Sequence, residues 1–185
     1  AMLVSIFLGM GITTTAAYLL VAIVVAPVLV QMGIPELAAH MFVFYYAVIS
    51  TITPPVALAA YAAAGIAGTD PLKTAITGFR VGIAKFVVPF YIIYRPDFIL
   101  VGADPLKAVV AIAMSLVGIW ALAGCSCGFM FRQLKPVERI VLFACIPLTI
   151  PPHFMFNALG TGIVCLISLV AWLNSRKPER MSAAA

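Results

Sequence analysis

Charge is scarce in this chain. Only 9% of its 185 residues are charged, and it has just six acidic residues and two histidines. An average soluble domain has roughly 25% charged residues. With 64% hydrophobic residues and a mean hydropathy of +1.17, the chain has more apolar surface than the interior of a soluble domain of 185 residues could bury. We therefore infer an all-α polytopic membrane protein, with roughly five or six membrane-inserted segments of about 20 residues each.

The scarcity of ionisable residues also argues against an enzyme or a metal centre. Cys125 and Cys127 form a C-x-C pair, but no histidine, carboxylate or second cysteine pair completes a ligand set. We interpret them, with Cys145 and Cys165, as small residues of membrane helices. The sequence has no nucleophile with a base, no paired carboxylates and no HExxH motif, so we expect no catalysis and no cofactor.

The net charge of +5 does not indicate a nucleic-acid partner, because the basic residues form no stripe with aromatic residues. They lie between apolar runs instead, as the positive-inside rule expects for the loops of a protein in a lipid bilayer.

Two irregular segments rich in hydroxyl groups interrupt the apolar sequence. The first is GMGITTT, from Gly9 to Thr15, and the second is STITPP, from Ser50 to Pro55. Non-helical backbone persists at membrane depth only where it lines a cavity enclosed by protein. Two such breaks flanked by half-length helices indicate a transporter site built from discontinuous helices, although a glycine hinge and a proline kink are the simpler explanation for each break alone.

The combination of hydroxyl groups and freed backbone suits a hard cation such as Na⁺. The residues that we expect to surround an ion and substrate site are Gly9, Gly11, Thr13, Thr14, Thr15, Ser50, Thr51, Thr53, Pro54 and Pro55. Within this set we expect Na⁺ at Thr13, Thr14 and Thr53.

The spacing of the apolar runs predicts three elements in residues 1–96: a hairpin, a broken helix and a span. Residues 1–30 should form a re-entrant hairpin whose second helix, Ala16–Val30, is too short to cross a bilayer. Residues 40–68 should form one broken helix, which Thr53–Pro55 interrupts. After a cap at Thr69 or Asp70 and a short segment, residues 76–95 should form a span.

Residues 97–185 differ in character and should form a C-terminal membrane extension with a polar tail. We expect a helix from Leu106 to Phe131 and a basic loop at Arg132–Arg139. Residues 140–173 should form two short spans folded around Pro151–Pro152 and Asn157–Gly162. If both spans are present, the loop and the basic tail share the cytoplasmic side.

Ionisable groups are absent from both breaks, which favours coupling to a metal cation over coupling to protons. Between Ala1 and Gly68 the only ionisable side chains are Glu36 and His40, both near the connection between the hairpin and the broken helix. A proton relay usually needs such groups along its path. His40 remains the one candidate proton carrier there, with an interfacial role as the simpler interpretation. We expect Lys85, inside an apolar run, to extend to the interface near Arg80.

At these residues the sequence resembles a known family. The stretches GMGITTTAAYLLVAIVVAPVL, AAHMFVFYYAVISTITPPVALAAYAAAGIAG and FRVGIAKFVVPFYIIYRP are similar to the fused large membrane subunit (permease) of tripartite ATP-independent periplasmic (TRAP) transporters, most of all to the TAXI type. The resemblance covers about residues 1–96. One departure is Thr13, where many relatives have proline, which adds a hydroxyl and a backbone donor at the hairpin tip.

The resemblance implies secondary active transport (symport) of organic anions such as carboxylates across the bacterial inner membrane, with Na⁺ as the coupling ion and H⁺ as the alternative. A periplasmic substrate-binding protein would deliver the substrate. The family core has two inverted halves and moves like an elevator. This chain would supply the second half, so we expect a longer polypeptide that also contains the N-terminal half and the small membrane subunit region, or else a start at Met2. The competing interpretation is a non-transporting membrane scaffold or assembly subunit.

Overall fold

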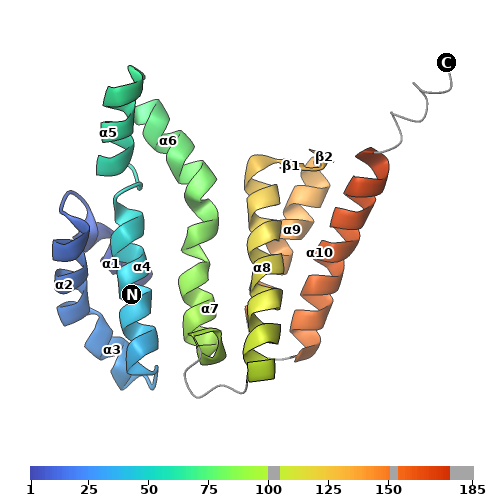
Figure 1. Ribbon diagram of the computed structural model, residues 1–185, viewed down its shortest axis with the longest axis horizontal. Helices are drawn as coiled ribbons and strands as arrows, with labels where there is room; N and C mark the ends of the chain where they lie inside the picture. Colours follow the sequence, from blue (N-terminus) through green and yellow to red (C-terminus); the bar gives the residue numbers. More distant parts are fainter. Residues whose placement is uncertain (100–104, 151–153, 176–185) are drawn as a thin grey trace. The chain divides into compact units, whose positions relative to one another are not determined.

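The computed structural model describes residues 1–99, 105–150 and 154–175. Within these ranges the regular elements are helices, apart from one hairpin of two strands with two residues each. The predicted all-α class is therefore confirmed. The chain divides into two compact units, residues 1–108 and 109–185, whereas the sequence predicts a boundary after residue 96. Figure 1 shows the elements of each unit, which we describe separately.

The predicted hairpin is formed by α1 (Met2–Gly9), α2 (Thr14–Val24) and α3 (Ala26–Gln31). Its tip is shorter than expected, because α2 begins at Thr14 and not at Ala16. Val25 interrupts the second arm, since Pro27 in the first turn of α3 cannot donate a hydrogen bond to the preceding turn. Together α2 and α3 reach a membrane-spanning length over Thr14–Gln31, so the second arm is longer than predicted.

The predicted broken helix consists of α4 (Glu36–Ser50) and α5 (Leu58–Ala67), separated by residues 51–57 (Figure 1). The break is where the sequence predicts it, but α4 begins at Glu36 and not at His40. Pro35 occupies the N-cap position, and the Glu36 carboxylate in the first turn suits the positive end of the helix dipole.

A third element follows from Pro71 to Tyr94 and is long and apolar enough to cross a membrane. It contains α6 (Pro71–Gly82), a 3₁₀ turn η1 (Ile83–Phe86) and α7 (Val88–Tyr94), and η2 (Pro96–Ile99) comes after it. Asp70 caps α6, because its Oδ1 atom accepts a hydrogen bond of 2.8 Å from the Lys73 backbone N–H. The predicted start of the span at residue 76 is thus five residues too late. The short segment capped by Asp70 and the span form one helical run that starts at Pro71.

Helix α4 lies at the centre of the first unit. The hairpin helices and α7 pack against it, and its core residues Phe42, Val43 and Tyr46 are buried. The Tyr46 hydroxyl donates a 2.7 Å hydrogen bond to the Phe86 carbonyl oxygen in η1. This contact satisfies a buried polar group and fixes the broken helix against the third element.

The second unit contains most of α8 (Pro105–Cys127), the strands β1 (Phe129–Met130) and β2 (Arg132–Gln133), and the helices α9 (Pro136–Thr149) and α10 (Phe154–Ser175). Two expectations were wrong here. The helix predicted to reach Phe131 ends at Cys127, because Gly128 takes a left-handed conformation with φ of 71° and the β1–β2 hairpin follows. The expected basic loop Arg132–Arg139 contains β2 and the first turn of α9.

The second wrong expectation is the fold at Asn157–Gly162, which lies inside α10. Asn157 is buried, and its Nδ2 atom donates a 3.0 Å hydrogen bond to the Thr149 carbonyl oxygen. A Cβ atom at Gly160 would lie 3.1 Å from the Thr149 side chain. These residues serve close helix packing, not a turn. Pro151–Pro152 and the basic residues Arg176, Lys177 and Arg180 lie outside the described residues.

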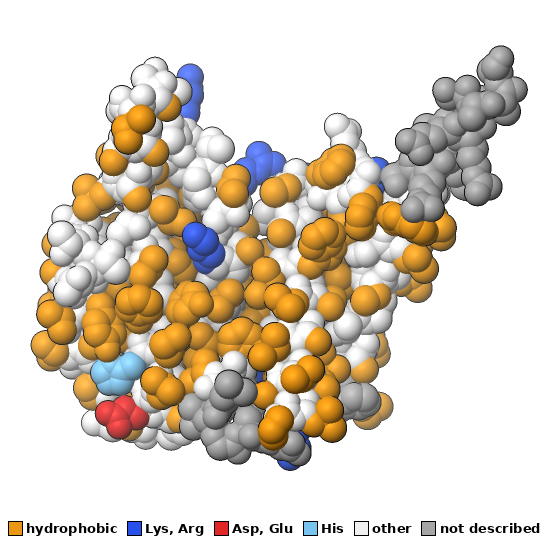
Figure 2. All heavy atoms as spheres, viewed as in Figure 1, with side chains coloured by type: hydrophobic (Ala, Val, Ile, Leu, Met, Phe, Trp, Pro, Cys, Tyr) orange, Lys and Arg blue, Asp and Glu red, His pale blue; other side chains and the backbone are white. Residues whose placement is uncertain are grey.

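Four helical segments among the described residues are long and apolar enough to cross a membrane: Thr14–Gln31, Pro71–Tyr94, Pro105–Cys127 and Met155–Asn174. Figure 2 shows apolar side chains spread over the face drawn, with few charged ones among them. Exposed side chains such as Ile66, Leu106 and Met155 would be unfavourable in water, but they are at home in hydrocarbon.

Candidate functional site: the hairpin tip and the helix break

The two predicted breaks meet in space. Ser50, the last residue of α4, is buried, and its Oγ atom is 2.9 Å from the Gly9 carbonyl oxygen and 2.6 Å from that of Ala47. Gly9 is the last residue of α1. The Ser50 hydroxyl therefore joins the end of the first hairpin helix to the end of the first half of the broken helix.

Glycine at position 9 is required by this contact. A Cβ atom there would lie 2.7 Å from Ser50 Oγ, closer than real Cβ contacts allow, and 3.1 Å from Ser50 Cβ, which is tighter than most. Gly11 has φ of 82°, a conformation that side chains disfavour, and a Cβ atom there would be 3.6 Å from Val56 of the break. The hairpin tip thus faces both ends of the irregular segment 51–57.

The hydroxyl groups at the break bond to carbonyl oxygens of α4. Thr51 Oγ1 donates to the Val48 carbonyl oxygen at 2.7 Å, and Thr53 Oγ1 donates to that of Ile49 at 2.8 Å. A hydroxyl that donates its hydrogen still has two lone pairs on its oxygen. These bonds therefore direct each proton towards α4 and leave the oxygen able to accept or to coordinate.

The irregular backbone of the break is folded on itself. The Thr51 carbonyl oxygen accepts a 3.0 Å hydrogen bond from the Ala59 N–H, and the Pro55 carbonyl oxygen accepts one from the Tyr61 hydroxyl. The Pro54–Pro55 peptide bond is cis, and Ala57, the N-cap residue of α5, has φ of 32°. These bonds tie the break to the first turn of α5.

At the hairpin tip the backbone donors lack such partners. No backbone hydrogen bond within the described residues involves the N–H groups of Gly11, Ile12 or Thr13. The N–H groups of the first turn of α2, which starts at Thr14, have no intrahelical partner either, as at every helix N-terminus. The tip therefore presents several donors and the positive end of a helix dipole.

The predicted site residues differ in burial. Ser50 and Thr53 are buried at 1% and 8% exposure, Thr14, Thr51 and Pro54 are half-buried, and Gly11, Thr13, Thr15 and Pro55 are exposed. The structure joins Gly9 to Ser50 and brings Gly11 to Val56. It shows no direct hydrogen bond, among the described residues, between the hydroxyls of the tip and those of the break.

Three supporting contacts were not anticipated from the sequence. The first is the hydrogen bond from Tyr46 to Phe86. The second is Gly82, where a Cβ atom would lie 2.8 Å from Cδ1 of Ile52 in the break. The third joins Tyr18 Oη to His40 Nδ1 at 3.0 Å, between α2 and α4. The aromatic residues in 42–46 indicate helix packing, but the sequence does not show which residues they contact.

Lys85 is exposed on η1, and its extension to the interface stays a prediction. Within the described residues, no group of three or more histidine, cysteine, aspartate or glutamate side chains could hold a metal ion.

The fold and these contacts define a class, a multi-pass all-α membrane protein in which a helical hairpin and a broken helix meet at their irregular segments. Residues 1–107 match the family model described as tripartite ATP-independent periplasmic transporter, DctM component, so the chain belongs to this family, the large membrane component of TRAP transporters. No curated protein and no solved structure matches the chain.

Proposed function

We propose that this chain carries the second half of the transport core of a TRAP permease of the TAXI type, and that it moves organic anions such as carboxylates by symport with Na⁺. It would act in the bacterial inner membrane and receive its substrate from a periplasmic binding protein. Residues beyond the family match, 108–185, would be the C-terminal membrane extension of a fused large subunit. The observation that carries this proposal is the Ser50–Gly9 contact, which joins the two breaks.

The chemistry of the two breaks supports two roles. Oxygen atoms of Thr13, Thr14 and Thr53, together with nearby carbonyl oxygens, suit Na⁺, a hard cation that prefers such ligands. The free N–H groups at the tip and at the start of α2 suit a carboxylate, because a helix N-terminus attracts anions. No arginine or lysine lies in either break, so the anion would be held by backbone donors in this half.

The alternative is a non-transporting scaffold, in which the breaks serve packing alone. The hydroxyl bonds of Ser50, Thr51 and Thr53 to α4 are compatible with that role. The two functions differ in ion dependence, because a scaffold has no reason to require Na⁺.

The test is uptake of labelled carboxylates by the complete transporter in proteoliposomes, with its binding protein present. A Na⁺ gradient, a K⁺ gradient and a proton gradient alone are compared. Uptake with Na⁺ only is the expected result. Full uptake with protons alone would contradict the cation site and would direct attention to His40 or to the other half of the core. No uptake under any gradient would favour the scaffold.

A further inference from the structure

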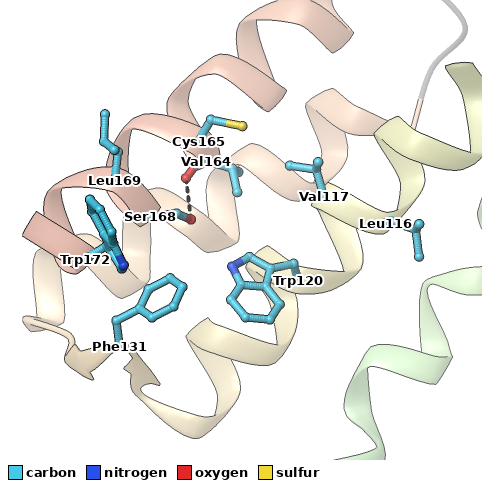
Figure 3. A pocket seen from close by; sticks show the side chains of 9 residues that line it. All are labelled: Leu116, Val117, Trp120, Phe131, Val164, Cys165, Ser168, Leu169 and Trp172. Carbon is cyan, nitrogen blue, oxygen red and sulfur yellow. Dashed lines mark hydrogen bonds between the residues drawn. The ribbon is translucent and has the colours of Figure 1, made fainter.

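The second unit contains an open apolar groove between α8, α10 and the β1–β2 hairpin. Its volume is about 460 Å³, within the range of roughly 300–1,000 Å³ that is typical of small-ligand sites. Figure 3 shows the rings of Trp120, Phe131 and Trp172 around one end, with Val164 and Leu169 along the wall. The one hydroxyl in the wall belongs to Ser168, which donates a 2.8 Å hydrogen bond to the Val164 carbonyl oxygen and is thereby satisfied.

The hairpin holds Phe131 at the groove in an unfavourable conformation. Phe131 is the tip of the hairpin, because Met130 pairs with Arg132, and its φ of 60° is uncommon for a bulky residue. Its ring lies 6.0 Å from that of Trp120. Such conformations persist where the surrounding structure imposes them, and they are concentrated at functional sites.

Basic residues follow directly after this aromatic end. Residues 132–139 contain Arg132, Lys135 and Arg139 against the single carboxylate of Glu138, a net charge of +2. Lys135 is exposed, and it lies four residues from Phe131, within about 14 Å along the chain. Tryptophan rings beside basic residues are typical of the boundary between hydrocarbon and lipid headgroups.

We propose that this groove binds an acyl chain of an anionic phospholipid, whose headgroup phosphate is held by Lys135, beside the ion pair of Arg132 with Glu138. The wall is mostly apolar and its one hydroxyl is satisfied, so it suits hydrocarbon. A helix is roughly 10 Å wide, so a groove of this volume would hold only about one helical turn. A transmembrane helix is therefore disfavoured as the occupant. The excess positive charge at the aromatic end selects an anionic over a zwitterionic headgroup.

The two tryptophans of the chain both line the groove, so tryptophan fluorescence, excited apart from that of tyrosine, reports on this site. The chain is placed in nanodiscs of zwitterionic lipid with a minor, equal fraction of brominated phosphatidylglycerol or brominated phosphatidylcholine. Stronger quenching by the brominated anionic lipid is expected. Lys135→Gln should lower this preference about fivefold, as expected for one basic residue near an anionic headgroup, and Arg132→Gln should lower it as well. Lys107→Gln, at the opposite end of α8, should leave it unchanged.

A second pair of variants tests the groove itself. Cys165→Phe places a ring in the groove, whereas Leu166→Phe changes a neighbouring exposed residue that does not line it. Quenching by brominated anionic lipid should fall in the first variant only, with both variants equally stable to heat. Equal quenching by the two lipids, or a preference that survives both Lys135→Gln and Arg132→Gln, would overturn the proposal. Absence of quenching by either lipid would also overturn it, because a protein segment would then cover the groove.

Discussion

At the scale of single residues, Gly9 decides whether the two breaks can meet. Gly9→Ala would place a Cβ atom 2.7 Å from Ser50 Oγ, so the Ser50 side chain or the two helices must shift. We expect a loss of about 1–3 kcal/mol in the free energy of unfolding, as for other overpacked sites. Thermal unfolding in detergent micelles measures it.

Two further variants make this test specific. Ser50→Ala in the Gly9→Ala background removes the clashing oxygen and should restore part of the loss. Gly65→Ala, in an exposed position of α5 with no atom within 4 Å of its added Cβ, should be neutral or stabilising by roughly 0.5–1 kcal/mol. Equal losses in Gly9→Ala and Gly65→Ala would contradict the close contact.

The sequence predicts which residues form the two breaks, but not which residues contact each other there. Glycines, prolines and hydroxyls identify the two breaks, because each of these residue types changes local backbone geometry. The Ser50–Gly9 contact joins residues 41 positions apart, and the Ile52 side chain fills the space at Gly82. Such partners depend on tertiary packing, which local patterns do not contain.

At the scale of elements, α9 is tied to the strand hairpin by a charged cluster. Glu138 accepts a 2.8 Å hydrogen bond from the Lys135 backbone N–H and forms an ion pair with Arg132. Burial opposes ionisation of Glu138, but these hydrogen bonds and the positive charge of Arg132 outweigh it and lower the pKa of the Glu138 carboxyl below its usual value.

This lowered pKa predicts a pH-dependent contribution to stability. The folded-state pKa is below the unfolded value of about 4.3, so the stabilisation is complete above the unfolded value and is lost as the pH falls through the folded one. Glu138→Gln should therefore lower stability near neutral pH, by less than about 1 kcal/mol for a pair that solvent still reaches. The difference from the wild type should disappear in acid. Thermal unfolding over a pH series checks this, and a difference that does not vary with pH would rule it out.

Sequence patterns located most helices but missed two features of the second unit. Gly128 ends α8 before Phe131, and a pattern of apolar residues cannot show that residues 129–133 form a strand hairpin. Asn157 and Gly160 suggest a turn because both residues favour turns in water. In a membrane helix the same small and polar residues permit close packing, and here they contact Thr149 of α9.

At the scale of the whole molecule, the distribution of charge predicts how the chain lies in the membrane. Helix α8 has 23 residues, about 34 Å, enough to cross the hydrocarbon core. The basic segment after it, Arg132–Arg139, should be cytoplasmic.

Cysteine labelling tests this topology. In a background with the four native cysteines replaced by alanine, Gln133→Cys should react with a membrane-impermeant reagent only from the cytoplasmic side. Lys107→Cys, at the other end of α8, should react only from the periplasmic side. Labelling of Gln133→Cys from the periplasm alone would mean that the chain is inserted the other way round.

The most direct test of the proposed transport site is the Na⁺ dependence of uptake by variants of the complete transporter. Thr14→Val and Thr53→Val keep the size of the side chain but remove an oxygen. Each should raise the Na⁺ concentration for half-maximal uptake about tenfold. This is the effect expected when a charged group loses one ligand whose contribution is similar to that of a hydrogen bond. Protein abundance should change less, and the exposed Lys85→Met control should be near wild type. Unchanged Na⁺ activation in both threonine variants would contradict a cation site at the hairpin tip and the helix break.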